Sequence, residues 1–200
     1  MKQSVKILVA FTILACVAFT TPKAERKVFT VVIDAAHGGK DFGAVHEGLK
    51  EKEIVRKITK KITALNNNTD VVFHVINEDD AFLDLQERVK AINSIKADLV
   101  ISLHVNAGKG GERSGMEFFV GESSQKSKEL AIRLSRKFEK QSFKTEVKSA
   151  KMLLVNKSEA PSIIFEMGYL TNNEDMLYLT SEEGQSKIAD VVIKFINEIK

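Results

Sequence analysis

Three residues able to bind a metal ion or transfer a proton each follow a short apolar run of this sequence. His37, His104 and Glu166 stand directly after runs rich in valine, isoleucine and leucine. Imidazole nitrogens and carboxylate oxygens are metal ligands and are also the common general acids and bases of enzymes. If the fold brings the three together, they can form a catalytic centre.

The apolar runs predict buried strands, because β-branched residues bounded by polar or glycine-containing segments are typical of a covered parallel sheet. The strands expected are 31–33, 71–76, 99–103, 116–120, 151–155 and 162–165. Amphipathic segments between them predict helices at about 51–65, 85–96, 123–140 and 181–199. Strands alternating with helices indicate one α/β domain, a three-layer α/β/α sandwich with a largely parallel central sheet.

Helical periodicity supports two of these helices. Ile54, Ile58 and Ile62 recur at steps of four and form one apolar stripe along the first helix. In the second helix, Leu85, Val89 and Ile92 are expected to face inward. A polar, glycine-containing loop at 108–115 is expected to border the functional groove.

The predicted topology places the candidate residues at one edge of the sheet. The carboxyl ends of parallel strands share an edge, so His37, His104 and Glu166 should meet there. Glu51 opens the helix after the first strand and belongs near the same edge. Two imidazoles, one carboxylate and an open position for water form a catalytic zinc site, and a second carboxylate can take a proton from that water.

Six short motifs resemble the zinc-dependent N-acetylmuramoyl-L-alanine amidases, a cell-wall amidase family of the Amidase_3 type. The resemblance covers about residues 28–200. The motifs are Asp34–Gly39, Lys40–Ala44, Glu51–Glu53, Arg88–Asn93, His104–Ala107 and Pro161–Asn172. The chief departure is Ala36, where the family usually has glycine; a positive φ at that position would strain the loop that carries His37.

The resemblance implies roles for four residues. His37, Glu51 and His104 would bind Zn²⁺, and Glu166 would be the general base. Glu47 and Glu53 are rival ligands close to Glu51.

The resemblance implies hydrolysis of the amide between N-acetylmuramic acid and L-alanine in peptidoglycan. Zinc would polarise the carbonyl and lower the pKa of its water toward about 7. Two alternatives stay open, a non-catalytic peptidoglycan-binding module and a zinc peptidase that cuts within the stem peptide.

Five further polar residues have less specific interpretations. Asp34 either orients a ligand or the loop, or forms a structural turn, and Asn106 either positions substrate or binds backbone. Arg88 is expected to be a structural or surface cation. His46 and His74 match no ligand position and are expected to be ordinary loop and strand residues.

The first 24 residues have the pattern of a signal peptide, which leaves one catalytic domain over 25–200. Lys2 and Lys6 precede an apolar run over 7–19, too short to span a bilayer comfortably. Three lysines of this segment account for the whole formal net charge of +3, so the basic character gives no support for nucleic-acid binding. We therefore expect an exported protein of the periplasm or cell envelope.

Cys16 is the single cysteine and lies in the predicted leader. Its surroundings loosely resemble a lipoprotein cleavage box, so a lipid anchor at Cys16 is a minor alternative. The exported domain would contain no disulfide and no thiol ligand. Since no wall-targeting domain is visible, an activator or targeting protein is a partner to expect.

Overall fold

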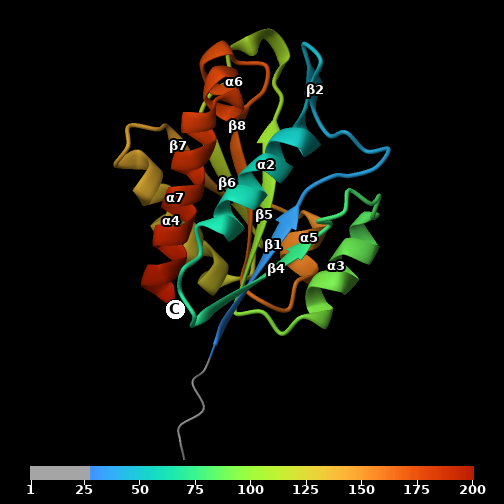
Figure 1. Ribbon diagram of the computed structural model, residues 1–200, viewed down its shortest axis with the longest axis vertical. Helices are drawn as coiled ribbons and strands as arrows, with labels where there is room; N and C mark the ends of the chain where they lie inside the picture. The colour runs from blue at the N-terminus through green and yellow to red at the C-terminus, as the bar shows by residue number, and fades with distance from the viewer. Residues whose placement is uncertain (1–27) are drawn as a thin grey trace, which may run out of the picture.

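A six-stranded sheet forms the centre of the computed structural model, which describes residues 28–200 (Figure 1). The strand order is β4-β1-β5-β8-β6-β7, and only the β6–β8 pair is antiparallel in this sheet. The strands are β1 (Phe29–Ala35), β4 (Val71–Ile76), β5 (Leu99–Asn106), β6 (Met116–Val120), β7 (Thr145–Ser149) and β8 (Ser162–Tyr169). The predicted fold class, a three-layer sandwich with a largely parallel sheet, is confirmed.

Helices cover both faces of this sheet (Figure 1). One layer holds α2 (Glu51–Ala64), α4 (Gln125–Glu139) and α7 (Glu182–Ile199), and the other holds α3 (Leu85–Ser94) and α5 (Leu153–Lys157). The remaining elements are the hairpin β2 (Val45–His46) and β3 (Leu49–Lys50), the 3-10 turn η1 (Lys109–Gly111) and α6 (Asn173–Thr180). The predicted leader and Cys16 lie outside the described residues. Within 28–200, no helix is long and apolar enough to cross a membrane.

The central strands are apolar throughout because both of their faces are covered. In β1, Val31 and Ile33 pack into the layer of α2, α4 and α7, whereas Val32 packs beneath α3 and α5. All three side chains are fully buried. This burial on both faces holds the carboxyl edge of the sheet rigidly in place, and the candidate residues lie along that edge.

One predicted strand is wrong. The segment 151–155 is not a strand: Leu153–Lys157 forms α5, and Leu154 and Val155 are buried against the sheet. The strand lies earlier, at β7, whose polar sequence suits an edge strand that pairs only with β6. Helix α6 and the β2–β3 hairpin were not predicted from the sequence.

The inward position predicted for Leu85 is also wrong, since its exposed fraction is 59%. Leu85 is the first residue of α3, after Asp84, whose carboxylate caps the helix and pairs with Glu87 in a capping box. The cap fixes the helix start, and the inward face then carries Arg88 and Ile92, while Val89 is partly buried.

Replacing Phe165 by alanine should lower the free energy of unfolding by about 4 kcal/mol, the usual cost of emptying a buried phenylalanine site. The Phe165 ring is fully buried and stacks on Phe118, with ring centroids 4.5 Å apart. Urea unfolding followed by circular dichroism measures the change. A loss below about 1 kcal/mol would contradict the tight packing described for this core.

Candidate active site

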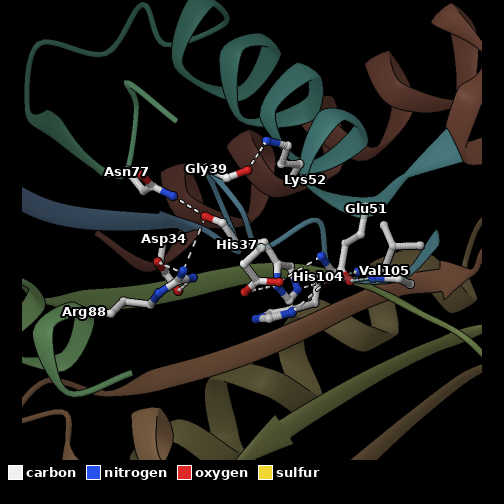
Figure 2. A network of polar contacts seen from close by, with 12 residues as sticks. Asp34, His37, Gly39, Glu51, Lys52, Asn77, Arg88, His104 and Val105 are labelled. Atoms are coloured by element: carbon white, nitrogen blue, oxygen red, sulfur yellow. Dashed lines mark hydrogen bonds and ion pairs between the residues drawn. The ribbon is translucent and has the colours of Figure 1, made fainter. Parts of the chain in front are cut away.

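Three elements bring His37, Glu51 and His104 to one point (Figure 2). His37 follows β1, Glu51 opens α2, and His104 lies within β5. Glu51 Oε1 lies 2.9 Å from His37 Nε2 and 3.0 Å from His104 Nδ1. One ligand atom from each residue lies within 4.8 Å of the other two, so the group could hold a metal ion.

The Glu51 carboxylate is buried and fixed by the backbone. Its Oε2 accepts a hydrogen bond from the Ala44 amide at 2.7 Å, and its Oε1 accepts one from the Val105 amide at 3.0 Å. The rivals Glu47 and Glu53 are exposed and lie outside the His–Glu–His group. Of the three glutamates, Glu51 alone combines burial with contact to both imidazoles.

His37 lies in a left-handed backbone conformation, with φ of +65°. Ala36 does not have a positive φ, so the replacement of the family's glycine by alanine causes no such strain, and Ala36 is buried. The Nδ1 atom of His37 lies 2.8 Å from Asp41 Oδ2. A carboxylate on the second ring nitrogen fixes the imidazole orientation and leaves Nε2 directed at Glu51.

Glu166 lies beside this group on the same face of the sheet. It is opposite His104 of β5 on one side and Glu117 of β6 on the other. Directly opposed residues of neighbouring strands point to the same face. His104 and Glu166 thus lie within their strands, not after them as the sequence suggested, because β5 and β8 both extend beyond the predicted ends.

The pKa of Glu166 is raised to about 7, chiefly by burial; the charges of Glu51 and Glu117 add to the rise, and those of His104 and His37 oppose it. Its Oε2 is buried and has no hydrogen-bond partner among residues 28–200. An unpartnered buried carboxylate oxygen is costly unless a ligand or water meets it. Glu166 is therefore suited to exchange a proton with a molecule that enters the site.

The pKa values of Glu51 and His37 are both shifted so that the charged form is favoured. Burial opposes ionisation of Glu51, but hydrogen bonds with His104 and His37 hold its pKa well below the usual range. Burial also disfavours charge on His37, but Glu51 and Asp41 raise its pKa above the usual value. A divalent cation could replace the proton between these groups, since it too would be stabilised by the buried Glu51 carboxylate.

A cleft of about 730 Å³ opens onto His37, His104 and Glu166. Apolar side chains form its walls: Phe82, Leu83 and Leu85 on one side, and Met152, Leu153 and Leu154 on the other. The loop 108–115 instead lines a second, more polar hollow with His46 and Thr171. The expectation that this loop borders the groove with the candidate residues is therefore wrong.

The donor set fits a catalytic metal site. Two imidazole nitrogens and one carboxylate oxygen converge, the described residues add no fourth member to the group, and Asp41 orients one of the histidines. Catalytic zinc sites have three protein ligands and an open position, whereas structural sites are closed by four.

The remaining candidates have structural contacts. Asp34 lies within β1, not in a turn, and forms a buried ion pair with Arg88, with Nη1–Oδ1 of 3.2 Å. Arg88 is therefore a buried cation and not a surface one. Asn106 donates a hydrogen bond to Glu117 at 3.2 Å. His46 lies in the β2–β3 hairpin and His74 in β4, and neither belongs to the His–Glu–His group.

Sequence reasoning missed two residues near the candidate site. Asp41 could have been found from its spacing, because it lies four residues after His37 in a short loop, where the two side chains can meet. Glu117 carried no local signal, because its position beside Glu166 depends on the antiparallel pairing of β6 with β8.

The family model for N-acetylmuramoyl-L-alanine amidase matches residues 31–198. The uncharacterized protein YqiI of Bacillus subtilis is 34% identical over 94% of this chain and 91% of its own length. An N-acetylmuramoyl-L-alanine amidase structure from Clostridium difficile 630 superposes with a TM-score of 0.81 at 27% identity, covering 86% of this chain and 96% of that one. The CwlD amidase of Clostridioides difficile, solved in complex with the GerS lipoprotein, superposes with a TM-score of 0.80 at 28% identity. The match covers 85% of this chain and 97% of that one.

Substituting Gly43 by alanine should weaken metal binding at least tenfold. A Cβ at Gly43 would lie 2.3 Å from Glu51 Oε2 and 2.7 Å from His37 Nε2, so both groups would have to move. Gly48→Ala is a matched control, because Gly48 also has a positive φ but has no atom within 4 Å of the added Cβ. Chelator competition with Zn²⁺ measures both, and equal affinities in the two variants would contradict the geometry described.

Proposed function

Since this chain belongs to the N-acetylmuramoyl-L-alanine amidase family, we propose that it hydrolyses, with zinc, the amide joining N-acetylmuramic acid to L-alanine in peptidoglycan. The observation that carries the proposal is the convergence of His37, Glu51 and His104 beside the unpartnered carboxylate of Glu166. Nucleophile activation, carbonyl polarisation and proton transfer can all take place within this one arrangement.

In this proposal His37, Glu51 and His104 are the metal ligands. Zinc, when bound, polarises the scissile carbonyl and lowers the pKa of water to near neutrality. The buried Glu51 carboxylate supplies the negative charge that favours a divalent cation, and the Ala44 and Val105 amides keep it in place. Asp41 holds the ring of His37 in the orientation that ligation requires.

Glu166 is the proposed general base and then the general acid. Its carboxylate takes one proton from the attacking water while the water oxygen bonds to the carbonyl carbon. The C–N bond then breaks, and Glu166 returns the proton to the departing nitrogen. The products are the free amino group of L-alanine and the carboxyl group of muramic acid, which retains the second proton of the water until it ionises in solution.

The substrate determines where the protein must act. Peptidoglycan lies outside the cytoplasmic membrane, so we infer export to the periplasm or cell envelope, with residues 1–24 as the signal peptide and 25–200 as the catalytic domain. We also propose an activator protein as a partner; the complex of CwlD with the GerS lipoprotein supports a protein partner at this domain. A lipid anchor at Cys16 is the minor alternative for attachment.

Glu166→Gln tests the catalytic assignment directly. The amide keeps the volume of the side chain but cannot accept the proton, so turnover should fall by about 10²–10⁴-fold. The purified protein with Zn²⁺ is incubated with purified peptidoglycan, and the released fragments are identified by mass spectrometry. Metal content, measured on the same samples, should be unchanged because Glu166 is not a proposed ligand.

Three results would contradict the proposal. Fragments cut within the stem peptide would identify a peptidase. Peptidoglycan binding without any release, even with an added activator, would identify a binding module. Full activity in Glu166→Gln would remove Glu166 from the mechanism.

The pH dependence of kcat/KM should show an acidic limb of unit slope. Glu166 must be ionised to accept the proton, and its pKa of about 7 without metal sets an upper bound, because a nearby cation lowers it toward 4.5. Activity should therefore decrease tenfold per pH unit below a midpoint between these values. A flat profile down to pH 4, in protein that retains its metal, would contradict this role.

A further inference from the structure

The loop that carries His37 is tied to the rest of the domain through its backbone carbonyl. Two side chains from different elements donate to the His37 carbonyl oxygen: Asn77, at the end of β4, and Arg88 of α3 (Figure 2). The Arg88 Nη2–oxygen distance is 3.4 Å. Both donors therefore act on the peptide group of a proposed metal ligand, and not on its ring.

This peptide group needs to be held because its backbone is strained. His37 has φ of +65°, a backbone conformation that residues other than glycine rarely adopt. Gly38 continues the turn with φ of +141°, and a Cβ there would lie 2.3 Å from the Ala81 carbonyl oxygen and from Asn77 Nδ2. Strain of this kind persists only where surrounding contacts fix the conformation.

Arg88 is in turn fixed by buried partners. Its side chain is nearly fully buried, and its Nη1 lies 3.2 Å from Asp34 Oδ1. Asp34, fully buried in β1, also accepts a hydrogen bond of 2.5 Å from the Ser102 hydroxyl of β5. The guanidinium is planar and rigid, so anchoring one nitrogen on Asp34 sets the direction of the next nitrogen toward His37.

Among the described residues, the Arg88 side chain donates hydrogen bonds only to Asp34 and to the His37 carbonyl. Its Nε is buried without a partner, and its residue exposure is 4%. An arginine that is buried with an incomplete set of hydrogen bonds is an expensive way to stabilise a fold. This cost is consistent with a role in function.

We propose that Arg88 and Asn77 are positioning residues that hold the strained His37 peptide, and thereby set the geometry and affinity of the metal site. Asp34 and Ser102 orient Arg88 for this role. The inference rests on the proposed function only in taking His37 as a metal ligand. The Asp34–Arg88 ion pair then positions the His37 peptide in addition to stabilising the fold.

Two variants test the inference. Asn77→Gly removes one donor, and its backbone φ of +66° favours glycine, so the fold should be retained. Arg88→Met removes the other donor at similar side-chain length. Each should weaken Zn²⁺ binding by about 10–100-fold, as loss of groups that orient metal ligands usually does. Chelator competition measures the affinity, and circular dichroism verifies the fold.

A control separates positioning from general destabilisation. Ile188→Ala empties a buried site in α7, on the opposite face of the sheet from Arg88, and lowers stability without touching His37. We expect it to keep the wild-type Zn²⁺ affinity. At saturating Zn²⁺, the Asn77 and Arg88 variants should show a lower kcat with little change in KM.

The inference fails if Asn77→Gly and Arg88→Met bind Zn²⁺ as the wild type does, or if Ile188→Ala weakens binding as much as they do. Its failure differs from failure of the proposed function. A wild-type protein that cleaves no peptidoglycan, with variants that still lose Zn²⁺ affinity, would overturn the function and leave the positioning role intact.

Discussion

A single buried carboxylate determines the arrangement of this domain's candidate site. Glu51 lies between His37 and His104, within 3.0 Å of each ring, and two backbone amides hold its oxygens. A buried charge without partners would cost several kcal/mol, so these four contacts are a condition of the fold as well as of the chemistry. The loop after β1, the start of α2 and strand β5 must all be in place before Glu51 can be buried.

The sheet places Glu166 at a fixed distance from this centre. β5, β8 and β6 are neighbours, and His104, Glu166 and Glu117 stand opposite one another across them. The register of hydrogen-bonded strands therefore sets the spacing of the three side chains without any flexible loop. A site built on strands is held more precisely than one built on loops, and only His37 here depends on a loop.

The sequence predicted the layers and the strand edge because these depend on local patterns. Apolar runs and helical stripes identified most elements, and the common edge of a parallel sheet brought His37, His104 and Glu51 together as expected. The errors were of another kind. β7 is a polar edge strand, α5 has the apolar composition of a strand, and Glu117 reaches the site only through an antiparallel pairing that no local pattern encodes. The positive φ of His37 was not predicted either, because backbone strain depends on the tertiary contacts that impose it.

Glu51 and Glu166 show how one fold gives the same side chain two different chemistries. Both are buried, and burial alone would raise the pKa of each. Hydrogen bonds and charge interactions with His104 and His37 reverse this effect at Glu51, which stays ionised and suits a cation. Glu166 has an unpartnered oxygen and negative neighbours, so its pKa stays near 7 and it can both take and return a proton. Environments that separate the pKa values of two carboxyl groups in this way suit one to bind a cation and the other to exchange a proton. The difference depends on the hydrogen-bond partners that each carboxylate oxygen has or lacks.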